Sequence, residues 1–99
     1  CDLLDPKATL KAEYRLLRDV SLPELEKNRR EGLVLQKQAR SDLRAALARA
    51  RKHPGKASSR AVAEARSQLA NASAWIIELR HQIPEARTSL KVLKRMAEE

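Results

Sequence analysis

Eleven apolar residues recur along the last third of this chain at alternating spacings of three and four. No step is missed over 36 residues, so the pattern is a heptad seam with apolar a and d positions. A seam of this kind must be buried by a partner helix, so it constrains the fold and favours binding over catalysis. The seam consists of Val62, Ala65, Leu69, Ala72, Ile76, Leu79, Ile83, Ala86, Leu90, Leu93 and Ala97.

The composition is typical of long helices rather than of a globular core. Of the 99 residues, 34% are charged and 2% are aromatic, and there is no Phe. The length predicts a single domain over residues 1–99. No stretch approaches 18 consecutive apolar residues, so the sequence predicts no membrane-spanning segment.

The single cysteine, Cys1, allows neither an internal disulfide nor a cysteine-rich metal site. This favours a reducing compartment, and we expect a cytoplasmic protein that could associate with a membrane through a partner. A first residue Cys1 followed by Asp2 is also compatible with a mature bacterial lipoprotein. A fragment boundary is the interpretation that we prefer.

Caps and breakers predict where the first two helices begin. Asp5 and Pro6 are typical of an N-cap and a first helical position, so a short helix is expected over about residues 6–19. Ser21-Leu22-Pro23-Glu24 has the pattern of a capping box. It predicts the start of a second helix, which extends over about residues 22–52.

The third helix is expected after His53-Pro54-Gly55, where proline and glycine end the second helix and reverse the chain. Ser58 or Ser59 is the expected cap of this helix, which should extend over about residues 59–97. Pro84 lies inside it at a position that points away from the seam. We therefore expect a kink or short break near Ile83 without loss of register.

A turn near residue 56 makes the second and third helices antiparallel. Close to the turn, small residues then face each other, as Ala39 faces Ala72. Further along, Gly32 falls opposite Leu79, and this large side chain needs cover from the first helix or from another protein. The predicted fold is therefore all-α: an antiparallel coiled-coil hairpin with a short N-terminal helix packed on its base.

Positive charge is concentrated on the half of the hairpin that contains the turn. Residues 37–66 carry nine basic and two acidic side chains, which is most of the net charge of +8. Such a surface attracts anionic lipid or nucleic acid, although the segment has no aromatic residue on which bases could stack. The alternative is an ordinary solvated helical surface. The candidate residues for binding phosphate or an acidic surface are Arg49, Arg51, Lys52, Lys56 and Arg60.

The sequence contains no pattern that indicates an enzyme. His53 lies in the turn and His81 on an outer face, and neither has acidic or cysteine neighbours at the spacing of a metal site. There is no glycine-rich phosphate loop and no nucleophile elbow. We therefore predict no catalytic residue, no metal site and no cofactor.

Two stretches resemble the HR1 (REM-1) repeat, the Rho-binding antiparallel coiled coil of protein kinase C-related kinases, rhophilin and rhotekin. In the second helix, residues 24–32 resemble the basic, Glu-containing stretch of the family that ends in Lys-Glu-Gly. In the third, Leu69, Ile76 and the run Leu79-Arg80-His81-Gln82-Ile83 resemble its Leu, Ile and Leu/Ile-Arg-x-Gln-Leu pattern. The resemblance covers about residues 22–84, with departures at Leu33 and Ala72.

The resemblance implies a non-catalytic interaction module that binds a GTP-loaded Rho-family small GTPase as part of a regulated effector. It places the contact on one outer face of the coiled coil. Trp75 could serve there as an aromatic anchor, although a core role is the alternative for its side chain. The candidate partner-binding residues are Arg30, Val34, Lys37, Trp75, His81 and Gln82.

Two other functions compete with GTPase binding. The basic tip could bind nucleic acid or an anionic membrane, and lipid binding is compatible with a membrane-anchored GTPase as partner. The chain could also form a structural homodimer, in which an uncovered part of the seam between Ile76 and Leu93 pairs with a second copy.

Overall fold

The computed structural model describes residues 5–98 and divides the chain into two compact units. The terminal unit consists of Cys1–Asn28 and Leu79–Glu99, and the hairpin unit consists of Arg29–Glu78. The expectations about Cys1 and Asp2 lie outside the described residues.

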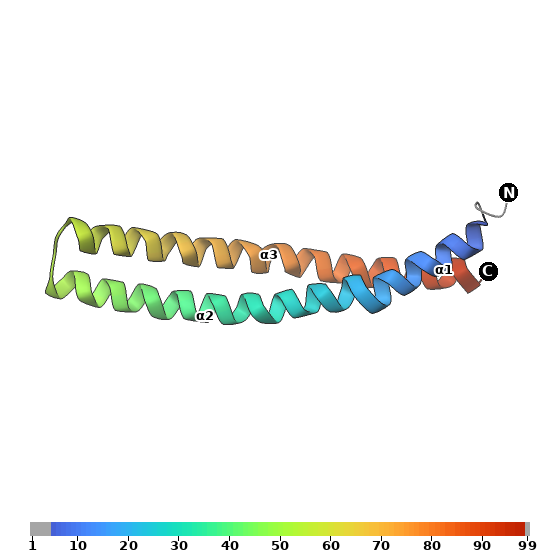
Figure 1. Ribbon diagram of the computed structural model, residues 1–99, viewed down its shortest axis with the longest axis horizontal. Coiled ribbons are helices and arrows are strands. Elements are labelled where there is room, and N and C mark those ends of the chain that lie inside the picture. The colour runs from blue at the N-terminus through green and yellow to red at the C-terminus, as the bar shows by residue number, and fades with distance from the viewer. Residues whose placement is uncertain (1–4, 99) are drawn as a thin grey trace. The chain divides into compact units, whose positions relative to one another are not determined.

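The described part of the chain is helical and contains no strand. Its elements are α1 (Pro6–Leu16), the π-helix η2 (Leu17–Ser21), α2 (Leu22–Lys52) and α3 (Lys56–Glu98). Figure 1 shows α2 and α3 joined by a single turn, with α1 preceding α2. The predicted all-α helical hairpin with a short N-terminal helix is therefore confirmed. Within residues 5–98, no helix carries an apolar stretch long enough to cross a bilayer.

The start of α1 is capped as the sequence predicts. The Asp5 side chain accepts a hydrogen bond from the Lys7 backbone N–H at 3.0 Å, and Pro6 occupies the first turn. The Thr9 hydroxyl also donates to the Asp5 carbonyl oxygen at 3.2 Å. The bond to Lys7 satisfies a backbone N–H that a helix start leaves without an intrahelical partner.

The predicted capping box at Ser21 is wrong, because no loop separates α1 from α2. Ser21 lies in η2, where the backbone N–H of Leu22 donates to the carbonyl of Leu17, five residues earlier. The half-buried residues on this stretch include Leu17, Ser21 and Leu25, which follow one another in two steps of four. A heptad alternates steps of three and four residues. Two successive steps of four therefore contain one residue more than the heptad does. The π-helix accommodates this residue, because its turn is wider than an α-helical turn.

The turn between α2 and α3 is tighter than predicted, and neither Ser58 nor Ser59 is the cap of α3. That helix begins at Lys56, and the Ser59 backbone N–H donates to the Gly55 carbonyl at 3.0 Å. The Ser58 hydroxyl donates to the carbonyl of His53 instead of capping its own helix. Ser58 therefore satisfies a carbonyl at the end of α2, and the turn is centred nearer Pro54 than residue 56.

Pro84 does not interrupt α3, so the expected break near Ile83 is absent. The Pro84 side chain is exposed, as its position outside the seam predicts. Proline removes one backbone donor, but on the outer side of a helix the carbonyl it leaves without a partner remains accessible to water. The expected kink at this position stays a prediction.

All eleven residues of the heptad seam are buried or half-buried. The deepest are Leu79 and Ile76, which are 1% and 2% exposed, followed by Ile83. The chain itself therefore covers Ile76, Leu79 and Ile83, so these residues need no cover from another protein. The structural homodimer stays a prediction, because Leu90 and Leu93 at the far end of this stretch are only half-buried.

Candidate protein-interaction surface

The packing of the hairpin unit depends on Gly32, which is buried on the side of α2 that faces α3. A Cβ atom at this position would lie 3.3 Å from Ile76 Cγ1 and 3.4 Å from Trp75 Cε3. The glycine was expected opposite Leu79, so its neighbours lie almost one helical turn away from the predicted ones. The tight turn at Pro54 explains this shift, because it moves the pairing of the two helices.

Gly32 thus has a structural role that offsets its unfavourable helix propensity, which is about 1 kcal/mol relative to Ala. It leaves room for the Trp75 ring and the Ile76 side chain to approach the backbone of α2. Nearby, Gln36 Nε2 donates to Ser73 Oγ at 3.1 Å across the two helices. This bond joins α2 to α3 at a position where the seam of α2 is polar.

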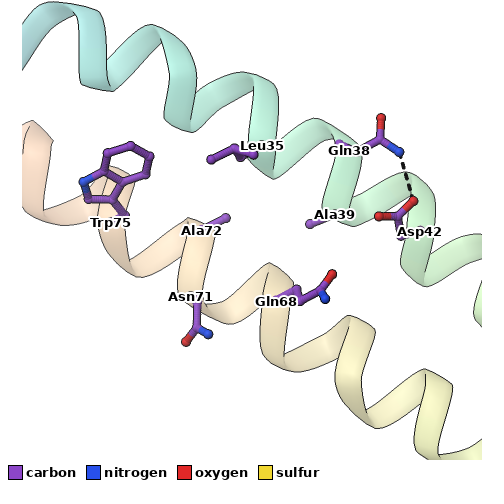
Figure 2. Close-up of a pocket in the computed structure, with 8 residues that line it drawn as sticks. All are labelled: Leu35, Gln38, Ala39, Asp42, Gln68, Asn71, Ala72 and Trp75. Carbon is purple, nitrogen blue, oxygen red and sulfur yellow. Dashed lines mark hydrogen bonds between the residues drawn. The ribbon is translucent and has the colours of Figure 1, made fainter.

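Trp75 is half-buried, so part of its ring is packed and part remains accessible. It borders a groove of about 490 Å³ in which Ala39 and Ala72 form the apolar floor. Figure 2 shows the Leu35 and Trp75 side chains in the space between α2 and α3. The polar lining of the groove consists of Gln38, Asp42, Gln68 and Asn71.

Three consecutive apolar residues of α2 are exposed directly after Gly32. Leu33 is 39% exposed, Val34 is 69% exposed and Leu35 is 53% exposed. Consecutive residues of a helix point about 100° apart, so three in a row cannot all face α3. Val34 and Leu35 also line an open hollow of about 430 Å³ together with Arg30 and Glu31.

The predicted partner-binding residues fall into two groups. Arg30, Val34 and Lys37 are exposed and share one face of α2, because they follow each other at spacings of four and three. Trp75 belongs to the same unit as these three, whereas His81 and Gln82 are exposed residues of α3 in the terminal unit. Their role in partner binding stays a prediction.

Leu35 is an exposed apolar residue of this surface that was not among the partner-binding residues predicted from the sequence. It lies at the border of both the groove and the hollow, and its exposure is comparable to that of Ile77. The signal was present in the sequence, because the run after Gly32 contains more apolar residues than the seam can bury.

The five predicted phosphate-binding residues surround the turn. They occupy the last turn of α2 and the first turns of α3, and all are exposed. No ion pair within residues 5–98 involves any of them. The amino-terminal end of a helix carries partial positive charge, so cations at the start of α3 are not stabilised by the helix itself. The cluster, here called the basic tip, consists of Arg49, Arg51, Lys52, Lys56 and Arg60.

The described residues contain no group of three or more His, Cys, Asp or Glu side chains that could hold a metal ion. Both His53 and His81 are exposed.

A comparison with protein-family models gave no match, and comparisons with curated proteins and with solved structures gave no significant one. The resemblance to the HR1 repeat is therefore carried by the pattern of residues in this chain alone.

Proposed function

We propose that this chain is a non-catalytic protein-interaction module whose partner is a GTP-loaded Rho-family small GTPase. The observation that carries the proposal is the exposed apolar run Leu33-Val34-Leu35, whose last residue lines the same groove as Trp75. Apolar and aromatic side chains of this kind form the centre of many protein interfaces.

The charges around this run favour an acidic partner surface. Arg30 and Lys37 flank Val34 on the same face of α2, and both are exposed. An apolar centre with a cationic rim gives affinity through burial and a faster encounter through electrostatic attraction. The HR1-like pattern of residues 22–84 identifies a Rho-family GTPase as the leading candidate for that partner.

A pulldown with several Rho-family members, each loaded with GDP or with a non-hydrolysable GTP analogue, tests the proposal. We expect binding of at least one GTP-loaded member, with an affinity that Val34→Asp lowers by about tenfold or more. The matched control is Ala45→Asp, which places the same charge on another exposed position of α2. Equal binding of the two nucleotide forms, or no binding at all, contradicts the GTPase assignment.

A second function is favoured by the unpaired cations of the basic tip. We propose that the tip rests on an anionic membrane while the hairpin unit binds its partner. Neutralising Arg49, Arg51, Lys52 and Lys56 to Gln should abolish sedimentation with vesicles that contain phosphatidylserine. Binding should also fall steeply with salt, because the contact is electrostatic. Weak salt dependence, or preferential binding of nucleic acid over vesicles, contradicts the lipid assignment.

A further inference from the structure

The terminal unit contains a hollow whose lining is dominated by cations. It has a volume of about 280 Å³ and lies between α1, η2 and the last turns of α3. Figure 1 shows where these elements lie near the two ends of the chain. The lining consists of Lys11, Tyr14, Arg15, Arg18, Lys94, Ala97 and Glu98.

The gathering of charge in this hollow is local. The terminal unit as a whole carries ten basic and nine acidic side chains and is therefore almost neutral. The hollow nevertheless brings four cations together with one carboxylate, that of Glu98. Lys11, Arg15 and Arg18 follow one another at spacings of four and three, so they lie on one face of the N-terminal segment. Lys94 is contributed by α3.

One of these cations is fixed in position by its neighbours. Arg18 Nε donates to Asp19 Oδ1 at 2.7 Å, and its Nη2 donates to Asp19 Oδ2 at 3.1 Å. The guanidinium carbon also lies 5.1 Å from the centroid of the Tyr14 ring, within the range of a cation–π contact. Because a guanidinium has five N–H donors, Arg18 retains donors beyond the two that Asp19 accepts.

The other cations have fewer partners. No ion pair or side-chain hydrogen bond within residues 5–98 involves Lys11 or Lys94. With Glu98 and Asp19 included, the charges around the hollow leave an excess of two positive charges. A phosphate monoester carries about −1.5 to −2 at neutral pH and presents three acceptor oxygens.

We propose that this hollow is a binding site for a phosphate monoester group. Lys11 and Lys94 approach the phosphate oxygens from the two sides, and Arg15 and Arg18 supply the flat donor groups that match those oxygens. The Tyr14 ring and Ala97 form the less polar part of the wall. The phosphate could be carried by a soluble ester or by a lipid headgroup, and both sources present the same chemistry.

The test uses the full chain and follows backbone amide NMR signals during titration with phosphoserine at constant ionic strength. We expect saturable shifts at Tyr14 and Ala97. The variant that combines Lys11→Gln and Lys94→Gln should weaken binding by about tenfold. The variant with Arg at both positions keeps the charge and should retain binding. A matched control combines Lys27→Gln and Lys91→Gln, which removes two exposed charges from the same unit outside the lining.

Vesicles that contain phosphatidylinositol 4-phosphate separate the two sources. If the Lys11→Gln and Lys94→Gln variant loses vesicle binding while the neutralised basic tip retains it, the phosphate belongs to a lipid headgroup. If the variant loses phosphoserine but vesicle binding is unchanged, the ligand is a soluble ester. The absence of saturable shifts, or equal affinity in the glutamine variant and in its control, overturns the proposal.

Discussion

The hairpin unit and the terminal unit contain parts of the same heptad seam but bury it differently. In the hairpin unit, most of the buried residues are small, namely Gly32, Ala39 and Ala65, and Ile76 packs beside the glycine. In the terminal unit, Leu79 and Ile83 are among the most buried residues. The heptad period determines which residues point inward, whereas the size of those residues determines how much apolar surface is buried.

The two units also differ in charge. The hairpin unit carries eleven basic and four acidic side chains, and the terminal unit is almost neutral. Spread over a surface, an excess of charge attracts partners at long range and is weakened by salt. The cations around Tyr14 are instead gathered in one hollow, which favours a small ligand of negative charge. The two units therefore share one heptad seam but differ in the kind of partner that their charges favour.

The largest expected effect compares two leucines of α3. Leu79 is 1% exposed in the terminal unit, whereas Leu69 is half-buried in the hairpin unit. Leu79→Ala should lower the free energy of unfolding by about 3 kcal/mol or more, because it leaves a cavity in a closely packed layer. Leu69→Ala should lower it by about 1–2 kcal/mol. Urea unfolding followed by circular dichroism measures both, and equal losses would contradict the difference in packing between the units.

The second expected effect concerns the close approach at Gly32. Gly32→Leu places a large side chain where even a Cβ atom would lie 3.3 Å from Ile76 Cγ1. We expect a loss of about 1–3 kcal/mol in stability, since overpacking outweighs the better helix propensity of leucine. Ala45→Leu is the matched control on an exposed position of α2 and should change stability by less than about 0.5 kcal/mol. A stable Gly32→Leu variant with unchanged Trp75 fluorescence would refute the role assigned to the glycine.

Much of the fold follows from local sequence, whereas pairing across the helices does not. The heptad spacing identified every seam residue, and Asp5 and Pro6 identified the start of α1. The pattern at Ser21 also resembled a helix start, but the half-buried stripe from Leu17 to Leu25 is continuous, and packing of that stripe outweighs a local cap.

The interaction surface was only partly predictable, because it also depends on how the two helices pair. The exposure of Val34 follows from its place outside the seam, but the partner of Gly32 depends on the length of the turn. A change of a few residues in that turn shifts the pairing by a helical turn. The cationic hollow could not be found from spacing alone, because Lys94 lies far from Lys11 in the sequence.

A smaller effect tests the register of the hairpin unit. Gln36 donates to Ser73 between the two helices at 3.1 Å in partly buried surroundings. Gln36→Ala should lower stability by about 1 kcal/mol, and a double-mutant cycle with Ser73→Ala should give a coupling of about 0.5–1 kcal/mol. Gln38→Ala is the control, because Gln38 bonds to Asp42 at 2.9 Å on the exposed surface of one helix. A coupling near zero between Gln36 and Ser73 would show that this bond does not fix the register.

The smallest expected effect lies in the terminal unit, where the bidentate hydrogen bond from Arg18 lowers the pKa of Asp19. The ordinary pKa of an aspartate is about 3.9, so the pair should survive below that pH in the folded chain. The pKa of Asp19 is lower in the folded chain than in the unfolded chain. The Arg18–Asp19 pair therefore contributes to stability above about pH 4, and this contribution is lost as the pH falls through the pKa of the folded chain. Both side chains are about half exposed, so solvent screening keeps this contribution small.

Titration of the Asp19 carboxyl carbon by NMR tests the origin of this shift. Arg18→Gln should raise the pKa of Asp19 towards the ordinary value, because it removes the main donor to the carboxylate. Arg15→Gln, the control, should raise it less, since Arg15 acts only through its charge. If the two substitutions raise the pKa equally, Arg18 is held no more firmly than its neighbours. The cations of the terminal unit would then form a diffuse surface like that of the hairpin unit, and the contrast between the units would be lost.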